Sequence, residues 1–503
     1  MTPPSRRRSL ILGLDGGTFD LLDPLVRAGE LPFLGSMMAK GFRSPLMSVF
    51  PPKTIPAWYS FATGQDPGSL GIFGFTEPDG GPGKSKLVQT FRPAQAIWDH
   101  LSRNGNTVGV VNFPIRSGYP INGFVIPGML GERPPTYPAD LRDSVETSMG
   151  RAWVPELPPY RESDRTKWMD LAGRSVEQSG EAAEILIERF RPDFLFVLFR
   201  ETDRVEHQLW SELSRPIREW APDLLPFWKA VDAACQRIDR AFRAAGGPAL
   251  TFVISDHGFG PARADFFTNR WLLENNYLKF LNGGDSFRRR LFARSVLAMD
   301  RLGIGRSMLS TMADRIRDRP NGDRLTQVLG GDSSFEGMAP KIDWKRTIAF
   351  SHPVPEGIYL NRRNPDLTPE QGQEALSDIR KKLESYEGAR IEVYEPTEIY
   401  RGQTLDRAPS LLLKIDDLAT EPRMDFSYPR PMLRHRPRFF YGTGVHRMDG
   451  ILLVAGDGVS LKHSLRPHLL VDVAPTVLAE MELPIPPAMT GTPFHRELNG
   501  ASA

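Results

Sequence analysis

Short runs of apolar residues recur along the chain, separated mostly by segments with helical spacing. The runs are SLILGL (9–14), TVGVVN (107–112), DFLFVLF (193–199), ALTFVIS (249–255), SLLLKI (410–415) and GILLVAG (450–456). Runs that are apolar at nearly every position are typical of strands buried on both faces, as in parallel sheets covered by helices. The pattern therefore predicts an α/β fold. Ligands of such folds bind beyond the carboxyl ends of the strands, so polar residues that follow these runs are the first candidates for function.

Two segments interrupt this alternation, and we expect both to be helical cap insertions within one catalytic domain spanning residues 1–503. Residues 131–190 begin with several prolines and carry Trp, Arg and Glu at helical spacings, whereas residues 276–345 are rich in arginine and end in a Gly-rich loop. Within the second segment Phe292, Val296 and Met299 predict a basic amphipathic helix. One such helix is weak evidence for a membrane surface, so packing on the core is the favoured interpretation.

Composition narrows the possible partners and the compartment. The 63 Lys and Arg residues nearly balance the 61 Asp and Glu residues, so the net charge of +2 gives no reason to expect a nucleic-acid polymer as partner. The only cysteine, Cys235, excludes an intramolecular disulfide and fits a reducing compartment. No stretch approaches the roughly 18 apolar residues of a membrane helix, and the basic N-terminus precedes a strand-like run. We therefore expect a soluble, cytoplasmic chain with no transmembrane segment.

Three candidate ligands follow the first and third apolar runs. Asp15 comes directly after the first run, where a turn residue is the ordinary interpretation. Asp203 and His207 are four residues apart in FRETDRVEHQLW, a spacing that puts both side chains on one helical face within reach of one ion. A surface ion pair is the common alternative for such a pair.

Three further candidates lie near the fourth and last runs. Asp256 and His257 follow ALTFVIS and precede glycines, and a carboxylate and an imidazole at a buried strand end need partners. His446 lies in a glycine-flanked loop before the last run, where a hydrogen-bonded loop histidine would be usual. Taken with the first three, these residues can form two oxygen and nitrogen sites, which suit Zn²⁺ or Mn²⁺.

One threonine lies between prolines in SVFPPKTIPAW (48–58). Thr54 resembles a helix N-cap, because Pro56 suits a first helical turn and Gly64 suits the end of a short helix. A hydroxyl at that position also feels the positive end of the helix dipole, which would help to hold an alkoxide. From these residues alone, Thr54 is either a cap or a nucleophile.

The motifs resemble the alkaline phosphatase superfamily, specifically its type I phosphodiesterase and nucleotide pyrophosphatase branch. The similarity runs from GLDGGTFDLLDPLVRAGELPFLG through FPPKTIPAWYSFATGQDPGSLGIFGF and TDRVEHQLW to GVHRMDG and VDVAPTVLAEMELPIPPAMTG. It implies a three-layer α/β/α sandwich with a mostly parallel central sheet and inserted cap segments. It also implies a hydrolase acting on phosphoric ester or phosphoanhydride bonds of a small-molecule substrate.

The resemblance further implies two divalent metal ions, most readily Zn²⁺, with Mn²⁺ as the alternative. One would be held by Asp15, Asp256, His257 and the Thr54 oxygen, and the other by Asp203, His207 and His446. Two such ions and three aspartates leave the site at +1, a charge suited to a phosphoryl anion. Thr54 would then be the nucleophile, and water would hydrolyse the phosphothreonine that it forms.

The chain departs from the nucleotide pyrophosphatase pattern after GSLGIF, where Gly74 and Phe75 replace the usual asparagine. VNFPIRSGYPINGF instead resembles a bacterial subgroup of predicted phosphohydrolases or phosphomutases, in which Asn112 would supply the missing donor. Lys53 is a candidate phosphate contact because it precedes Thr54. Four arginines lie just upstream of His446, in a segment that is either a surface loop or an anion gate over the site. They are Arg430, Arg434, Arg436 and Arg438.

Other activities remain open on this ligand set. A phosphomutase or phosphotransferase would use the same intermediate and pass the phosphoryl group to an alcohol, and a catalytically silent binding protein could share the fold. A sulfatase is disfavoured, because KTIPAW lacks the Cys or Ser and the Arg of its nucleophile motif. Substrate identity, mono- or diester preference and oligomeric state are not predicted.

Overall fold

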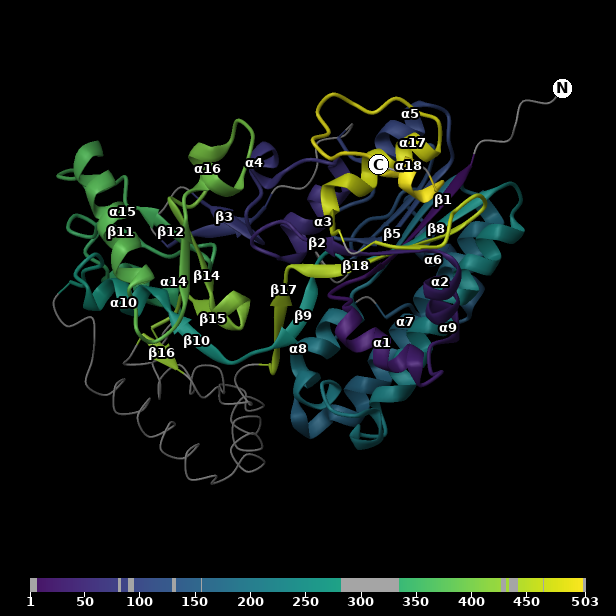
Figure 1. Cartoon of the computed structure of the whole chain (residues 1–503), viewed down its shortest axis with the longest axis horizontal. Coiled ribbons are helices and arrows are strands. Elements are labelled where there is room, and N and C mark those ends of the chain that lie inside the picture. Colours follow the sequence, from purple (N-terminus) through teal and green to yellow (C-terminus); the bar gives the residue numbers. More distant parts are fainter. Residues whose placement is uncertain are drawn as a thin grey trace.

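The computed structural model describes residues 7–79, 83–88, 95–128, 133–154, 156–281, 334–426, 431–433, 442–464 and 466–500. The predicted amphipathic helix around Val296 and the four arginines of the upstream loop lie outside the described residues. The described part forms a larger sandwich of helices and sheet and a smaller lobe beside it (Figure 1).

The central sheet has nine strands in the order β19-β2-β18-β8-β1-β7-β5-β6, with β20 beside β2. Their bounds are β1 (Arg8–Leu14), β2 (Phe42–Met47), β5 (Val108–Phe113), β6 (Gly123–Pro127), β7 (Phe194–Phe199), β8 (Ala249–Ile254), β18 (Asp449–Gly456), β19 (Lys462–His463) and β20 (His468–Leu469). Within this sheet, β18 pairs antiparallel with both β2 and β8, whereas the neighbours β8–β1, β1–β7, β7–β5, β5–β6, β2–β19 and β2–β20 pair parallel. The predicted mostly parallel sheet is confirmed.

Helices cover both faces of this sheet, because its strands are apolar on both sides. In β1 the side chains of Leu10, Leu12 and Leu14 join one core cluster, and Ile11 joins the other. The first face is covered by α1 (Phe19–Arg27), α2 (Pro32–Lys40), α6 (Leu141–Met149), α7 (Arg165–Phe190) and α9 (Leu224–Ala244). The second is covered by α3 (Thr54–Thr63), α5 (Ile97–Arg103), α17 (Val473–Glu480) and α18 (His495–Leu498). The three-layer sandwich is thus confirmed.

Two of the six apolar runs take places that their pattern does not specify. The run at 450–456 forms β18, which runs against the other strands of the sheet. The run at 410–415 forms β14 (Leu411–Ile415), which lies in the smaller lobe and pairs antiparallel with β12 and β13. Continuous apolarity reports burial on both faces, and it does not report which sheet a strand joins or its direction.

The smaller lobe packs its own sheets and helices around a separate core (Figure 1). One sheet has the order β15-β10-β16 and the other β11-β12-β14-β13. Their strands are β10 (Ala264–Phe267), β11 (Ala349–Phe350), β12 (Gly357–Leu360), β13 (Ile391–Tyr394), β15 (Thr420–Arg423) and β16 (Met432–Leu433). The lobe also contains the helices α10 (Thr268–Glu274), α14 (Phe335–Met338), α15 (Pro369–Glu384) and α16 (Pro396–Ile399). This lobe contacts the sandwich through Glu356, whose Oε1 lies 2.8 Å from Lys53 Nζ.

The first predicted insertion supplies helices α6 and α7, which pack in the core of the sandwich. Trp168 and Val176 of α7 are buried, and Cys235 of the neighbouring α9 is buried in the same cluster. A role of residues 131–190 as a cap over the site stays a prediction. No helix among the described residues is long and apolar enough to cross a membrane.

Candidate active site

The candidate ligands gather at one edge of the central sheet. Strands β8, β1 and β7 are neighbours and run parallel, so their carboxyl ends lie together. Asp15 follows β1, Asp256 follows β8, and helix α8 (Glu201–Leu213) begins just after β7. The topology therefore brings together three segments that are far apart in the sequence, at the edge where α/β proteins bind ligands.

The first cluster consists of Asp15, Asp256 and His257, all of them buried. His257 Nε2 lies 3.5 Å from Asp15 Oδ1 and 3.3 Å from Asp256 Oδ2. These three facing atoms are buried and have no hydrogen-bond partner among the described residues. The other carboxylate oxygens are bonded, since Trp58 Nε1 donates to Asp15 Oδ2 at 3.1 Å and the Gly16 amide donates to Asp256 Oδ1 at 3.2 Å.

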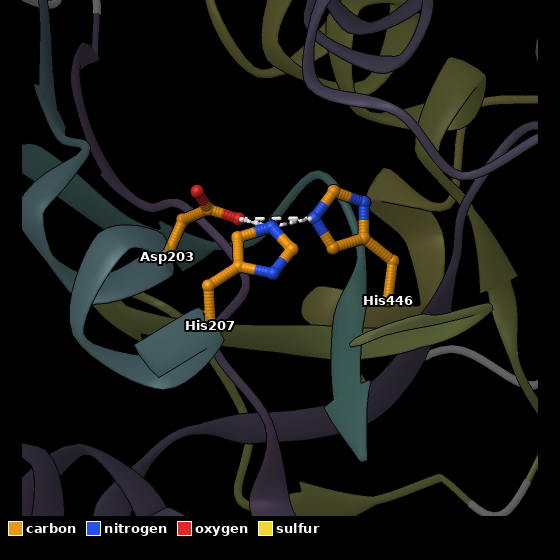
Figure 2. Close-up of side chains that lie close together, drawn as sticks. All are labelled: Asp203, His207 and His446. Carbon is orange, nitrogen blue, oxygen red and sulfur yellow. Dashed lines mark hydrogen bonds and ion pairs between the residues drawn. The ribbon is translucent and has the colours of Figure 1, made fainter. Parts of the chain in front are cut away.

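The second cluster consists of Asp203, His207 and His446 (Figure 2). His446 Nε2 lies 3.0 Å from Asp203 Oδ1 and 2.9 Å from His207 Nε2. Asp203 and His207 lie four residues apart on α8, and His207 Nε2 is 3.4 Å from Asp203 Oδ1. The predicted helical pair thus points its polar atoms at one spot, and His446 approaches that spot from β17 (Gly444–Arg447).

Backbone carbonyls orient all three imidazoles in the same way. His207 Nδ1 lies 3.1 Å from the carbonyl oxygen of Gly444, and His257 Nδ1 lies 3.1 Å from that of Gly258. His446 Nδ1 lies 2.6 Å from the carbonyl oxygen of Pro52. A carbonyl accepts, so each Nδ1 carries the proton and each Nε2 keeps its lone pair for another ligand. Histidines that bind metal ions are commonly oriented in this manner.

The two clusters abut through His257 and His446, whose rings stack with centroids 3.6 Å apart and planes 20° apart. Strand β17 pairs antiparallel with β9 (Gly258–Pro261), and His446 lies opposite Phe259 in that register. The β9–β17 ribbon therefore places the last candidate ligand beside the first cluster, although the two strands are distant in sequence.

Thr54 is the first residue of α3, and the N-cap position belongs to Lys53. The interpretation of Thr54 as N-cap is wrong by one residue, whereas the predicted helix end at Gly64 is confirmed, with φ of 61°. Among the described residues the Thr54 hydroxyl has no hydrogen-bond partner, although the residue is only 3% exposed. The segment around Thr54 contacts both clusters, since the Pro52 carbonyl lies 2.6 Å from His446 Nδ1 and Trp58 donates to Asp15. Contact of the Thr54 hydroxyl with the first cluster stays a prediction.

Burial and neighbouring charges set the proton affinities of the carboxylates. Burial raises the pKa of Asp15 well above its ordinary value, and the charge of Asp203 adds to this. Burial likewise raises the pKa of Asp256, with Asp15 as the next cause. Burial also acts to raise the pKa of Asp203, but His207 and His446 outweigh it and lower the pKa. In the first cluster burial therefore favours the protonated carboxyl groups, and a cation bound there would displace their protons.

A further carboxyl group, Glu206, lies in the same surroundings. It is fully buried, and neither of its carboxyl oxygens has a partner among the described residues. Burial, followed by the charges of Asp203 and Asp15, raises its pKa well above the ordinary value. Sequence reasoning missed both Glu206 and Trp58. The signal in the sequence that could have identified Trp58 is its spacing of four residues from Thr54.

The two predicted substrate contacts have protein partners. Lys53 Nζ lies 2.8 Å from Glu356 Oε1 of the smaller lobe. Asn112, at the end of β5 with φ of 62°, donates from Nδ2 to Ser179 Oγ at 3.1 Å and to the Leu198 carbonyl at 3.2 Å. Contact of either side chain with a substrate stays a prediction.

The donor sets fit metal ions. Each cluster offers carboxylate oxygens and Nε2 atoms within 4.8 Å of one another. Such mixed oxygen and nitrogen sets bind Zn²⁺ and Mn²⁺. The three unpartnered atoms of the first cluster support the same conclusion, because buried polar atoms in proteins are rarely left unpaired.

The family model of type I phosphodiesterases and nucleotide pyrophosphatases matches residues 9–437, and the chain belongs to this family. It is therefore a hydrolase of phosphoric ester or phosphoanhydride bonds, as predicted. No curated protein matches the sequence.

Solved structures with the same fold are enzymes of the alkaline phosphatase superfamily. Phosphonoacetate hydrolase from Sinorhizobium meliloti 1021, bound to phosphonoformate, is 16% identical with a TM-score of 0.52, covering 95% of this chain and 96% of its own. Alkaline phosphatase PafA is 14% identical with a TM-score of 0.57, over 98% and 99% of the two chains. Murine ectonucleotide pyrophosphatase/phosphodiesterase 5, bound to AMP, is 13% identical with a TM-score of 0.54, over 97% of each chain. At these identities the likeness establishes the fold.

Proposed function

We propose that the protein is a two-metal phosphohydrolase of phosphodiesterase or nucleotide pyrophosphatase type that acts through a covalent phosphothreonine on Thr54. The observation that carries the proposal is the pair of abutting clusters with three Nε2 lone pairs directed into them. The proposed ligands are Asp15, Asp256, His257 and Thr54 for one ion and Asp203, His207 and His446 for the other.

When bound, two divalent ions, Zn²⁺ or Mn²⁺, would lower the pKa of the Thr54 hydroxyl and stabilise the charge on the attacking and leaving oxygens. Thr54 Oγ forms a bond to phosphorus as the ester P–O bond breaks, and the leaving alcohol gains one proton for the one that Thr54 loses. Water then attacks the phosphothreonine, which releases the phosphate product and restores the hydroxyl. The first turn of α3 holds Oγ at the positive end of the helix dipole.

A phosphomutase or phosphotransferase is the second candidate, because it would use the same ligands and the same intermediate. The two activities differ only in whether water or an alcohol accepts the phosphoryl group. A catalytically silent protein is disfavoured, since the six proposed Asp and His ligands form two clusters that abut. The substrate is proposed to be a small-molecule phosphate ester, and the cytoplasmic location stays a prediction.

The test combines metal analysis with turnover. The purified protein is expected to bind about two equivalents of Zn²⁺ or Mn²⁺ and to release nitrophenol from nitrophenyl phosphate or bis-nitrophenyl phosphate. Rapid acid quenching during turnover of a labelled ester should trap label on Thr54. A metal-loaded protein that leaves both esters intact, with and without added alcohol acceptors, would exclude the hydrolase and the transferase alike.

A further inference from the structure

A cavity of about 370 Å³ lies between the segments that follow α3 and the smaller lobe. Its lining residues come from 71–78 and 83–88 on one side and from 344–363 and 406–410 on the other. The volume falls within the roughly 300–1,000 Å³ of pockets that hold a small molecule. The described residues that line it include neither Thr54 nor any of the six proposed metal ligands. The cavity is therefore a candidate binding site in addition to the two clusters.

Three aromatic rings line one side of this cavity. Strands β11 and β12 pair antiparallel with Phe350 opposite Tyr359, and the two rings stack with centroids 6.0 Å and planes 23° apart. The ring of Trp344 meets that of Phe350 edge to face at 5.3 Å. All three residues line the cavity, and each is only partly buried. They form an apolar surface on which a planar ring of a ligand can stack.

The Tyr359 hydroxyl adds a polar contact to this aromatic surface. It makes no hydrogen bond with the described part of the chain, although a largely buried phenol usually finds a partner. Burial raises the pKa of Tyr359, so the hydroxyl keeps its proton at neutral pH and can donate it to a ligand. A donor beside stacked rings suits a ring that carries acceptor atoms, as heteroaromatic rings do.

The lining also has an excess of positive charge. Four basic and two acidic residues take part in it: Lys84, Arg362, Arg363, Arg407, Glu77 and Asp406. Arg407 lies 2.6 Å from Glu77, and Lys86, outside the lining, lies 3.8 Å from the same carboxylate. Three basic residues then stand against one acidic residue, which leaves the lining with a net charge of +2. Burial lowers the pKa of His352 against the opposing effect of Glu336, so this lining histidine is neutral at pH 7.

This charge selects among ligands that carry a planar ring. A phosphate monoester has nearly two negative charges at pH 7, which match the excess, and Arg and Lys are its usual partners in proteins. An amine would be repelled by the basic residues. A bare phosphate ion would leave the aromatic surface uncovered, whereas a ring without an anionic group would leave the excess charge unmatched.

We propose that this cavity is a second ligand site, which binds compounds that join a planar heteroaromatic ring to a phosphate group. The ring stacks on the surface formed by Trp344, Phe350 and Tyr359, and the phosphate pairs with the basic residues of the lining. Because no proposed metal ligand lines the cavity, binding there needs no metal ion. The inference therefore goes beyond the proposed hydrolase and does not depend on it.

Calorimetric titrations of Thr54→Ala protein test the site, since this variant lacks the proposed nucleophile and should not consume the ligands. AMP contains both parts of the ligand, adenosine lacks the phosphate, and ribose 5-phosphate lacks the ring. With a chelator present to empty the two clusters, AMP is expected to bind at least about tenfold more tightly than either partial probe. Flavin mononucleotide in the same titration distinguishes a nucleobase from a flavin as the preferred ring.

Two variants of the lining separate the ring from the phosphate. Tyr359→Leu removes one ring and should weaken AMP binding about tenfold without changing that of ribose 5-phosphate. Lys84→Gln combined with Arg362→Gln should weaken AMP binding about tenfold without changing that of adenosine. Both of these side chains are exposed, so this variant provides the test even if Tyr359→Leu fails to fold. Lys381→Gln, an exposed lysine of α15 outside the lining, is the control and should bind AMP normally.

Several results would overturn the proposal. AMP that binds no more tightly than ribose 5-phosphate would reveal a site for an anion only, and AMP that binds no more tightly than adenosine would reveal a site for a ring only. Binding that disappears with the chelator would belong to the two clusters, and binding unchanged in the lining variants would lie elsewhere. None of these measurements uses ester hydrolysis, so failure of this site leaves the proposed function standing.

Discussion

The ring of His446 stacks on that of His257 at a centroid distance of 3.6 Å, although the two histidines belong to different clusters. A change at His446 should therefore affect the second cluster directly and the first through this contact and through the charge of Asp203. The two halves of the site are joined by ring packing and can be separated by mutation.

His446→Ala is expected to lower the bound metal from about two equivalents to about one and to reduce turnover by on the order of 100-fold or more, because one proposed ligand is lost. Metal content by mass spectrometry, measured with ester hydrolysis, checks this. His463→Ala, on β19 at the sheet edge, is the matched control and should keep both ions. Full metal content in His446→Ala would remove that residue from the ligand set.

Thr54→Ala should retain its metals and its fold while losing turnover by orders of magnitude, since the proposed nucleophile is gone. The N-cap position belongs to Lys53, so the alanine variant should lose less than the roughly 1 kcal/mol that loss of a capping side chain costs. Thermal unfolding and ester hydrolysis measure the two effects. Thr54→Ser should keep measurable turnover. A stable Thr54→Ala protein with wild-type turnover would contradict the covalent mechanism.

Trp58→Phe should weaken metal binding at the first cluster by about 10- to 100-fold, because Asp15 Oδ2 loses its 3.1 Å donor while the aromatic packing remains. Competition with a chelator measures the affinity. Trp98→Phe is the matched control, since that indole is also buried and donates to a different partner, Tyr119 Oη, at 2.7 Å. Equal affinities in the two variants would mean that the indole does not orient Asp15.

Metal binding at the first cluster should strengthen as the pH rises above the ordinary range of a free aspartate. The pKa values of Asp15 and Asp256 are raised, chiefly by burial, so the metal-free carboxyls hold protons that an ion must displace. The metal affinity should stop rising at the pH above which both carboxyl groups are already ionised in the metal-free protein. Calorimetry in buffers of different ionisation enthalpy counts the released protons. Uptake without proton release would show that the carboxylates are already ionised.

Asn112→Ala tests the predicted donor to the phosphoryl group. The backbone of Asn112 has φ of 62°, which alanine tolerates poorly, so the variant should be destabilised by about 1 kcal/mol. Asn112→Gly removes the amide without that strain and isolates the chemical role. If both variants have a normal kcat/KM, Asn112 only ties β5 to Ser179 and Leu198.

The strands and the proposed metal ligands could be predicted because their signals are local. Six strands are apolar runs, and the ligand candidates mostly follow such runs or lie one helical turn apart, as Asp203 and His207 do. Parallel neighbours then bring the strand ends together without further information.

The rest depends on contacts between distant segments. Nothing in the local sequence indicates that β14 joins the smaller lobe or that Glu356 pairs with Lys53, which is 303 residues away. Similarly, the Pro52 carbonyl becomes an orienting group only because the fold brings His446 to it. Partners of this kind follow from packing, and a single sequence does not record packing.

The β9–β17 pairing also bears on the order in which the site is assembled during synthesis. The first cluster is complete once residue 257 has been made, whereas the second waits for residue 446, near the C-terminal end of the chain. A nascent chain that has not reached residue 446 would therefore carry the proposed ligands of one ion only. A chain truncated before that residue would lack the complete proposed site, even with the first cluster folded.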